Sequence, residues 1–405
     1  MHVLIVSQYF WPEIFKINDL AEGLIERGHR VTVLTGQPNY PQGQFFPGYG
    51  FKTRELYKNI EIIRSPIIPR GKNRIQLALN YLSYSLFASI VGMLRCKRPD
   101  VIFVFEPSPI TVGLPAIFLK KLKKSPILFW VQDLWPESAI AVGAISAKPI
   151  VKSLEKLVHF IYKRCDYILT TSKSFFNSIK KYQVTDNKLK YFPQTCEPFY
   201  QPMCYSLNTE EEKLLPKGFR IVFSGNIGIA QDTETVLQAA KLLKDVKEIK
   251  WIFIGDGSKR HWLQNEIQQH DLQETIFWVG QHPAESMPRF FACSDALLVL
   301  LKKDPVYSLT VPGKIQSYLA CAKPIIAALD GEGRQIIEEA HAGLTTHSGD
   351  PQALANIVRQ MYKLGSDERT HMGLNGRQYF DKHFNRETLL NNLEKWMTEL
   401  MEKHQ

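Results

Sequence analysis

The sequence predicts an α/β protein made of two doubly wound parallel-sheet domains that follow one another along the chain. Apolar strand-like runs alternate with helical patterns, and this rhythm begins again near Arg220, after a segment rich in proline and acidic residues. Glycines and polar residues collect in the loops that follow the strands, where doubly wound folds bind ligands. With 405 residues, of which 44% are hydrophobic and 22% charged, both domains can bury a full core.

The first domain is expected over residues 1–200. Its opening run, HVLIVS, is continuously apolar like a strand buried on both faces, and the next stretch has the spacing of an amphipathic helix. The predicted strands are residues 2–7, 29–36, 100–109, 126–133 and 166–172, with a helix at 15–28 and further helical stretches between the later strands.

The second domain is expected over residues 201–384, and residues 191–218 have the composition of a linker. Residues 385–405 form an amphipathic terminal helix. Strands are predicted at 220–228, 250–257, 275–280, 295–301 and 324–329, and helices at 232–244, 260–269 and 314–320.

Charge is divided unevenly along the chain. Residues 1–200 hold 27 Lys and Arg against 14 Asp and Glu, whereas the rest of the chain is slightly acidic. Such an excess favours an anionic membrane surface, an anionic substrate or nucleic acid, although a basic surface that serves only solubility has the same composition. No zinc-finger or RNA-binding signature supports nucleic acid.

Cysteine usage and the first residues indicate a cytoplasmic protein. The six cysteines lie far apart without C-x-x-C spacing, which fits reduced thiols better than disulfides or a zinc site. The chain opens directly on a strand with no basic leader or cleavage site, so no signal peptide is expected.

The stretch LTVPGKIQSYLACAKPIIAA, residues 309–328, has the composition of an anion-binding helix start. A helix start carries unpaired N–H groups and a positive partial charge, so Gly313 and Lys314 beside it suit a phosphate. An ordinary loop followed by a helix with a solvated lysine would give the same letters.

The motifs RGHRVTVLTG, NYPQG, QDLWPES, GNIG, GDG and VPGKIQSYLACAKPIIA, in this order, resemble glycosyltransferase family 4. The resemblance covers nearly the whole chain and is strongest to the branch of capsule and O-antigen enzymes similar to L-fucosamine transferases. It implies the GT-B fold, with an N-terminal acceptor domain, a C-terminal nucleotide-sugar domain, and a last helix, residues 385–405, that crosses back to the first domain.

The resemblance also implies a donor site in the second domain, with no metal and no other cofactor. Surface-loop and helix-start roles remain alternatives for His282 and Arg334. The implied donor residues are Gly225, Asn226, Gly228, Gly255, Gly257, Gly280, Gln281, His282, Thr310, Gly313, Lys314, Ser317, Glu332 and Arg334.

The chain departs from the wider family at two paired positions. Asn226 and Gln231 stand where most members carry an Arg-x4-Lys pair, and Leu309 and Ser317 stand where they carry a Glu-x7-Glu pair. Two phosphate-facing cations are therefore missing, and Lys314 with Arg334 are the candidates to replace them.

Asp133 is the first candidate for aligning or deprotonating an acceptor hydroxyl, because it stands at the carboxyl end of the predicted strand 126–133. Glu137 and Glu106 are second candidates. A helix N-cap over LWPES would also explain Asp133, and a turn carboxylate would explain Glu106. Gln132 stands where the family often has a histidine.

The loop PNYPQG suggests acceptor contacts through Asn39, Tyr40 and Gly43, although turn chemistry alone would also select these residue types.

The function implied is transfer of a sugar from a nucleotide diphosphate sugar, expected to be UDP-linked, with retention of configuration. The expected acceptor is a polyprenyl-diphosphate-linked precursor of capsule, O-antigen or exopolysaccharide, at the inner face of the cytoplasmic membrane. A GT-B epimerase or hydrolase of nucleotide sugars is an alternative, as is a catalytically weak binding or scaffold protein, which the missing charged pairs suggest.

Residues 75–94 form a 20-residue run without a formal charge. Arg70, Lys72 and Arg74 flank it before, and Arg95, Lys97 and Arg98 flank it after. A membrane span is rejected, because it would separate strands of one parallel sheet. A helix that buries its apolar residues against the sheet is one alternative, and a helix whose start lies at the membrane face, with Tyr81 and Tyr84, is the other. Burial would apply to Ile75, Leu79, Leu82, Leu86, Ile90 and Met93.

Overall fold

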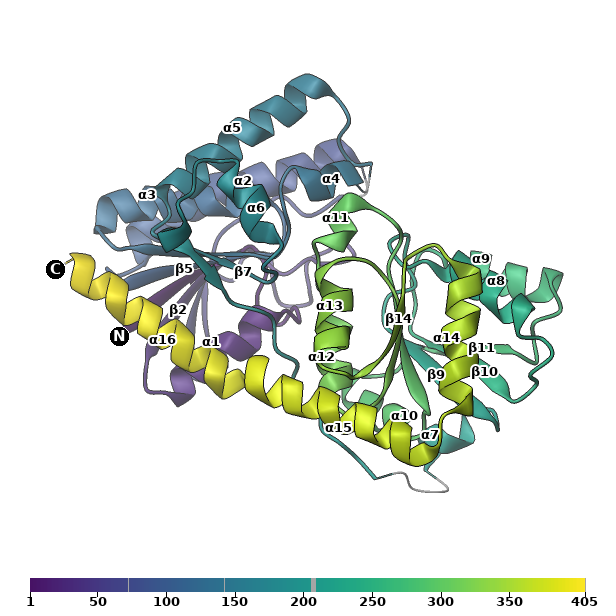
Figure 1. Cartoon of the computed structure of the whole chain (residues 1–405). Helices are drawn as coiled ribbons and strands as arrows, with labels where there is room; N and C mark the ends of the chain where they lie inside the picture. Colours follow the sequence, from purple (N-terminus) through teal and green to yellow (C-terminus); the bar gives the residue numbers. More distant parts are fainter. Residues whose placement is uncertain (72, 142, 205–208, 405) are drawn as a thin grey trace. The chain divides into compact units, whose positions relative to one another are not determined.

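The computed structural model describes residues 1–71, 73–141, 143–204 and 209–404, and it divides into two compact units (Figure 1). The first unit comprises Met1–Pro193 and Leu389–Gln405, and the second comprises Gln194–Thr388. The chain thus changes unit at 193/194 and at 388/389, each a few residues away from the domain boundaries predicted from the sequence at 200/201 and 384/385.

Among the described residues, the first unit contains an eight-stranded sheet in the order β3-β4-β2-β1-β5-β6-β7-β8. All neighbouring strands pair in parallel except β3 and β4, which form a hairpin whose turn residues Lys58 and Asn59 both have positive φ. The strands are β1 (His2–Val6), β2 (Arg30–Thr35), β3 (Arg54–Tyr57), β4 (Ile60–Arg64), β5 (Val101–Glu106), β6 (Ile127–Val131), β7 (Tyr167–Thr170) and β8 (Leu189–Tyr191).

The predicted strands of this domain are confirmed as β1, β2, β5, β6 and β7, whereas β3, β4 and β8 were not predicted. The helical elements of the unit are α1 (Lys16–Glu26), α2 (Arg74–Arg95), η1 (Ile110–Val112), α3 (Gly113–Lys123), α4 (Glu137–Ala141), α5 (Lys148–Arg164), α6 (Phe175–Lys180), η2 (Asp186–Lys188) and α16 (Arg386–His404).

The terminal helix α16 completes the core of the first unit. Leu390, Leu393 and Met397 are buried there together with side chains of β1, β2 and β5. The Trp396 ring meets Phe192 edge-on, with 6.0 Å between the ring centroids. The amphipathic pattern of residues 385–405 therefore corresponds to a helix with one face buried.

The regularly spaced apolar residues of helix α2 are exposed, so the expectation that they are buried against the sheet is wrong. The side facing the protein is polar: Asn80 Nδ2 donates to Ile68 O over 2.6 Å, and Ser85 Oγ donates to Thr111 O over 3.0 Å. These buried hydroxyl and amide groups donate hydrogen bonds to carbonyl groups of neighbouring loops. The opposite face is apolar and exposed, and it carries Ile75, Leu79, Leu82, Leu86, Phe87, Ile90, Met93 and Leu94.

By length and composition, α2 is also long and apolar enough to cross a membrane. It connects β4 to β5, which belong to one sheet, and it packs against α3 and η1. A crossing at this point would place parts of that sheet on opposite sides of the bilayer.

Within the described residues, the second unit contains a six-stranded parallel sheet in the order β11-β10-β9-β12-β13-β14. Alternate residues of each strand enter different cores: Ile252 and Ile254 of β10 belong to one cluster, and Trp251 and Phe253 belong to the other. This period of two marks a sheet covered on both faces. The strands are β9 (Phe219–Ser224), β10 (Ile249–Ile254), β11 (Ile276–Gly280), β12 (Ala296–Leu300), β13 (Ile325–Ala328) and β14 (Gly343–Thr346).

The five strands predicted for this domain are confirmed, and β14 was not predicted. All six cysteines are unpaired in this structure. The helical elements are α7 (Glu210–Lys213), α8 (Thr233–Leu242), α9 (Arg260–Gln269), η3 (Ala284–Ser286), α10 (Met287–Ala292), α11 (Pro305–Ser308), α12 (Gly313–Ala320), α13 (Glu332–Glu339), α14 (Pro351–Lys363) and α15 (Ser366–His383).

Candidate active site

The loops after β9, β10 and β11 are packed against one another in the second unit. Gly255 N donates to Gly280 O over 2.8 Å, and a Cβ placed on Gly255 would lie 2.1 Å from Gly225 O. Gly255 has φ +135°, which L side chains rarely adopt. Only glycine therefore lets the three loops approach this closely.

The Asn226 side chain fills the space between two further glycines. A Cβ on Gly228 would lie 2.7 Å from Asn226 Nδ2, and a Cβ on Gly257 would lie 2.5 Å from Asn226 Oδ1. The loops after β9 and β10 thus form one small glycine-lined surface around this amide.

Lys314, the second residue of α12, points its ammonium group toward this glycine surface. Its Nζ lies 3.5 Å from the centroid of the Phe223 ring and 3.4 Å from Gln231 Oε1, and a Cβ on Gly225 would lie 3.7 Å from it. Among the described residues, no carboxylate forms an ion pair with Lys314.

Burial without a counterion lowers the pKa of Lys314 to about 7. The start of α12 lies beside it, with N–H groups that have no acceptor within the helix. A bound anion would restore the lysine charge and accept hydrogen bonds from these groups, so the arrangement suits a phosphate or diphosphate.

The loop after β13 closes against α11. Gly331 has φ +75°, and a Cβ there would lie 1.7 Å from Ser308 O. Glu332 begins α13 and is buried. Thr310, by contrast, directs its hydroxyl back to Val306 O over 3.3 Å, and Ser317 is buried inside α12.

Three other residues predicted for the donor site have partners of their own or lie in solvent. Arg334 Nε donates to Glu338 Oε1 over 2.7 Å, so its charge is already paired. His282 packs edge-on against Phe290, and its Nε2 lies 3.2 Å from Val279 O. Gln281 is exposed.

Two residues that the sequence did not single out hold this region in place. Tyr318 OH accepts from Ser224 N over 3.1 Å, and Trp278 Nε1 donates to Gly255 O over 2.8 Å. Both contacts depend on the tertiary fold. Their aromatic character within apolar runs was the only signal in the sequence.

In the first unit, carboxyl groups gather at the ends of neighbouring strands β5 and β6. Glu106 is fully buried, and among the described residues neither of its carboxyl oxygens has a hydrogen-bond partner. Burial, reinforced by Asp133, raises its pKa well above the usual range. Asp133 is half-buried, and desolvation raises its pKa to about 6.

These differences separate the roles of the three predicted carboxyl groups. Burial without a hydrogen-bond partner among the described residues disfavours the charged form of Glu106, whereas Asp133, with a pKa of about 6, is ionised at neutral pH, so Asp133 is the better proton acceptor. In the part of the chain that the structure describes, the Asp133 carboxylate accepts no hydrogen bond from the start of α4; Ser138 N donates to Leu134 O instead. Glu137 begins α4, with one carboxyl oxygen buried.

The predicted acceptor loop rests on Glu13, which the sequence did not single out. Glu13 Oε1 accepts from Asn39 N over 2.8 Å and from Tyr40 N over 2.7 Å, and burial raises its pKa to about 7. Asn39 is buried and uses its side chain within the loop, and a Cβ on Gly43 would lie 1.8 Å from Arg70 O. Turn chemistry therefore explains Asn39 and Gly43.

Of the three predicted acceptor residues, Tyr40 is the exposed one. Its ring contacts Tyr9 and Phe15, and the Arg70 guanidinium carbon lies 5.3 Å from its centroid. Arg70 also donates from Nη1 to Tyr9 OH over 3.2 Å. An aromatic surface with one cation thus lies after β1 and β2.

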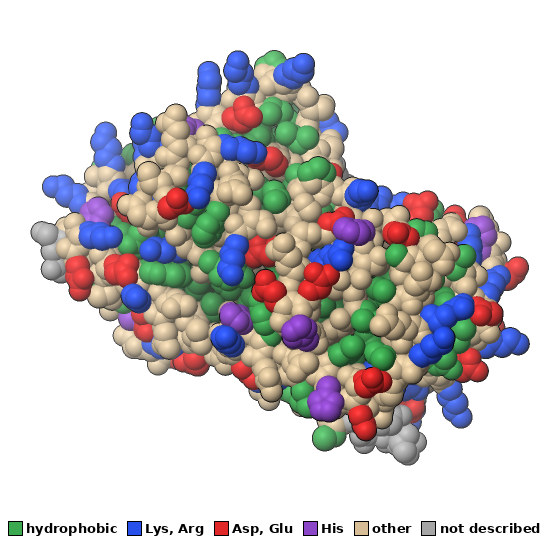
Figure 2. Space-filling model, in the orientation of Figure 1, with side chains coloured by type: hydrophobic (Ala, Val, Ile, Leu, Met, Phe, Trp, Pro, Cys, Tyr) green, Lys and Arg blue, Asp and Glu red, His purple; other side chains and the backbone are tan. Residues whose placement is uncertain are grey.

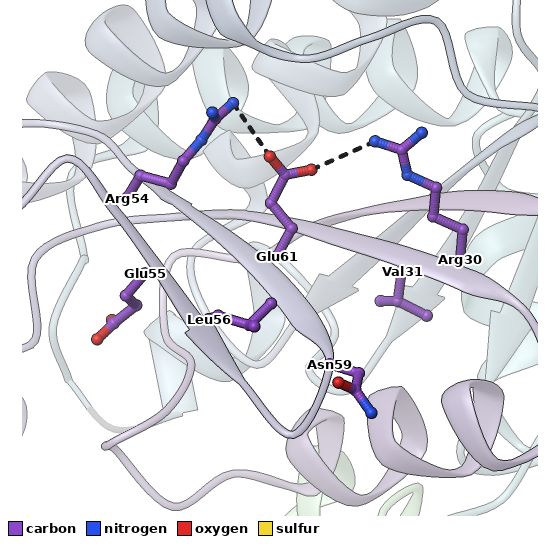
Figure 3. A pocket seen from close by; sticks show the side chains of 7 residues that line it. All are labelled: Arg30, Val31, Arg54, Glu55, Leu56, Asn59 and Glu61. Atoms are coloured by element: carbon purple, nitrogen blue, oxygen red, sulfur yellow. Dashed lines mark ion pairs between the residues drawn. The ribbon is translucent and has the colours of Figure 1, made fainter.

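A separate hollow lies at the edge of the first sheet, as Figure 3 shows. Its charges are paired: Glu61 pairs with Arg54 over 3.0 Å and with Arg30 over 3.6 Å, and Glu55 pairs with Lys52, outside the lining, over 2.7 Å. Arg30 begins β2, so the hollow lies toward the amino ends of the parallel strands, away from the end where such sheets bind ligands.

Among the described residues, no group of three or more His, Cys, Asp or Glu is arranged to hold a metal ion.

Two models of known protein families match this chain. Residues 17–195 match the model "Glycosyltransferase Family 4", and residues 207–379 match the model "Glycosyl transferases group 1". The chain belongs to glycosyltransferase family 4. The family resemblance of the sequence motifs is thereby confirmed.

Relatives of this chain are bacterial glycosyltransferases, and the name of one refers to colanic acid biosynthesis. "Probable glycosyltransferase WbjE" of Pseudomonas aeruginosa is 29% identical over 73% of this chain and 75% of its own length. "Putative colanic acid biosynthesis glycosyl transferase WcaI" of Escherichia coli is 24% identical over 79% of this chain and 81% of its own length. The chain is a glycosyltransferase of polysaccharide biosynthesis.

Solved structures confirm the GT-B fold. HepE of Anabaena, in complex with UDP, superposes with a TM-score of 0.68 at 13% identity, covering 98% of this chain and all of that one. A trehalose-6-phosphate structure from E. coli with UDP-2-fluoro glucose gives 0.74 at 13% identity, covering 99% of each chain.

Proposed function

We propose that this glycosyltransferase transfers a sugar from a UDP-sugar to a lipid-linked precursor of a bacterial polysaccharide, without a metal ion. The observation that carries the proposal is Lys314: a cation beside a helix start and a glycine-lined surface, with no counterion among the described residues.

The chemistry needs positive charge where the leaving group forms. As the bond between the anomeric carbon and the diphosphate oxygen breaks, negative charge grows on the diphosphate, and Lys314 with the first N–H groups of α12 stabilises it. In this proposal Lys314 takes the part that a divalent cation would otherwise play. The missing Arg-x4-Lys pair makes this contribution larger.

The acceptor belongs to the first unit in this proposal. Its hydroxyl forms the new bond to the anomeric carbon, and Asp133 aligns that hydroxyl and takes its proton. The sugar keeps its anomeric configuration, as the family resemblance implies. The coupling constant of the anomeric proton in the product tests this point.

The choice of UDP is supported by two structural relatives, whose titles describe complexes with UDP and with UDP-2-fluoro glucose. Neither the epimerase or hydrolase alternative nor the scaffold alternative agrees with the family assignment. Transfer itself is tested with radiolabelled UDP-sugars and membranes as the source of acceptor: label should enter a lipid-extractable product.

Thermal unfolding with UDP, GDP and ADP tests the donor. A ligand at a hundred times its Kd stabilises by about 2.7 kcal/mol, which raises the Tm of a unit this size by roughly 5–10 °C. UDP should give this shift, and GDP and ADP should not. A larger shift with GDP or ADP would overturn the choice of UDP.

Membrane association in this proposal is supported by α2. Its outward face is apolar from Ile75 to Leu94, and Arg70, Arg74 and Arg95 lie at its two ends. Figure 2 shows further Lys and Arg side chains gathered over α3 and α5 of the same unit. Lys72, which the sequence grouped with these cations, lies outside the described residues. An apolar face with basic flanks fits the cytoplasmic surface of an anionic bilayer.

A further inference from the structure

The first unit contains an apolar cavity of about 430 Å³ between α2 and the segment that runs from α4 into α5. Leu77, Ala78 and Leu82 of α2 form one wall, and Ile150 and Leu154 of α5 form another. Cavities of roughly 300–1,000 Å³ accommodate ligands of drug-like size. None of the described residues that line it carries a carboxylate, so the cavity suits a hydrocarbon.

We propose that this cavity binds the hydrocarbon chain of an isoprenoid diphosphate, the lipid part of the acceptor, next to its phosphates. This inference rests on the proposed function and adds to it a defined binding site for the acceptor lipid.

One end of the cavity is continuous with the apolar face of α2. Leu82 lines the cavity and is 56% exposed, and Leu86 follows one turn later on the same face at 59%. Ile150, on the other wall, is 52% exposed. A hydrocarbon chain can therefore pass from a bilayer along α2 into the cavity while it remains in contact with apolar side chains.

Another part of the lining leads to the candidate catalytic residues. Trp135 lines the cavity and lies between Asp133 and Glu137 in the chain. Tyr81, on the α2 wall, lies close enough to Tyr9 to influence its ionisation, and Tyr9 belongs to the aromatic surface around Tyr40. A lipid held here would have its polar end close to the groups assigned to the acceptor.

Two arginines supply charge for the phosphates. Arg74 lines the cavity and donates from Nη2 to Gly143 O over 3.0 Å, which uses one of its five N–H groups. Arg70 donates to Tyr9 OH and stacks on Tyr40. Among the described residues, neither guanidinium pairs with a carboxylate, so both can bind a diphosphate.

The test measures binding of farnesyl diphosphate and of inorganic pyrophosphate to the full chain by titration calorimetry. Saturating UDP occupies the donor site, and farnesyl diphosphate stays below its micellar concentration. Ala78→Trp and Ala147→Trp each fill the cavity from a different wall at an exposed position. Ser153→Trp adds the same bulk to exposed α5 surface outside the lining and is the matched control.

The expected result is that farnesyl diphosphate binds at least tenfold more tightly than pyrophosphate. Both cavity variants should reduce its affinity at least tenfold, Ser153→Trp should leave it within twofold, and UDP affinity should be unchanged in all three. Equal binding of the two diphosphates, or cavity variants that behave like Ser153→Trp, would overturn the site while UDP binding stands. Loss of UDP binding in the unmodified chain would instead contradict the proposed function.

Discussion

At the scale of single residues, Lys314 shows how a fold can prepare a charge for a ligand. Its ammonium faces an aromatic ring and an amide oxygen, and it has no counterion among the described residues. Such a group binds water poorly and gains from any anion that reaches it. Its contribution can therefore be measured directly with UDP.

Lys314→Ala should weaken UDP binding roughly ten- to hundredfold, because a charge-assisted hydrogen bond contributes about 1.5–3 kcal/mol. Titration calorimetry measures the change. Lys303→Ala removes an exposed lysine before α11 and is the control, with an expected change of less than twofold. Equal Kd values for the two variants would remove Lys314 from the donor site.

The lowered pKa of Lys314 predicts a pH dependence. Only the protonated lysine attracts the diphosphate, and with a pKa of about 7 in the free protein the charged fraction falls as pH rises from 7 to 9. The Kd for UDP should therefore rise over this range, approaching tenfold per pH unit. Lys314→Ala should bind weakly but at a constant affinity across the same range. A flat profile for the unmodified protein would contradict this explanation.

Asp133→Asn should leave the UDP affinity within twofold and lower the transfer rate by about 10²–10⁴-fold, because it removes a proton acceptor at nearly constant volume. Glu106→Gln is the matched control: burial raises the pKa of the Glu106 carboxyl and disfavours the charged form that a proton acceptor needs, so its amide analogue should keep the rate within a few fold. In the unmodified enzyme the rate should rise with pH through about 6. If Glu106→Gln lowered the transfer rate more than Asp133→Asn, Glu106 would be the proton acceptor.

The sequence predicted these residues to different degrees for a physical reason. The Pro-Gly-Lys motif at a helix start consists of residues adjacent in the sequence, so Lys314 could be predicted from the sequence alone. Glu13 could not, since its importance comes from two amide groups of a loop that lies 26 residues later. The alternative that turn chemistry explains Asn39 fits its contacts better, because its side chain is consumed within that loop.

At the scale of elements, α2 shows that the periodicity of apolar residues predicts a helix but does not predict which of its faces is buried. The spacing of Leu79, Leu82 and Leu86 predicted a helix correctly, but the same stripe fits a core or a membrane. Asn80 and Ser85 determine which face of α2 packs against the protein. They donate hydrogen bonds to carbonyl groups inside the protein, which apolar side chains could not do. Those partners come from distant loops and are invisible in a local pattern.

The exposed face of α2 predicts binding to anionic vesicles. Leu86→Glu combined with Ile90→Glu should reduce co-sedimentation at least tenfold, because each apolar side chain gives up about 1.5–3 kcal/mol of burial. Leu242→Glu changes an exposed leucine of α8 and should have no effect. High salt should also weaken binding. Equal sedimentation with neutral and anionic vesicles, or none with either, would contradict the membrane assignment.

At the scale of the whole molecule, the chain forms two units with separate cores, and its last residues return to the first. Leu393 is fully buried in the core that contains β1 and β5, although α16 follows directly on the second unit. The two doubly wound domains could be predicted because each repeats the same rhythm of strands and helices. The two points where the chain changes unit could not be placed to the residue, since composition changes gradually there.

This division predicts that the two units respond to different perturbations in thermal unfolding. Leu393→Ala leaves a cavity in the first unit, which typically costs 2–5 kcal/mol and lowers its Tm by roughly 5–20 °C. UDP should raise only the transition of the second unit, which contains Lys314. Glu402→Ala, on the exposed side of the same helix, should move neither transition. Scanning calorimetry of the full chain, with and without UDP, separates the two responses, and a single transition shifted by both perturbations would show that the units do not unfold independently.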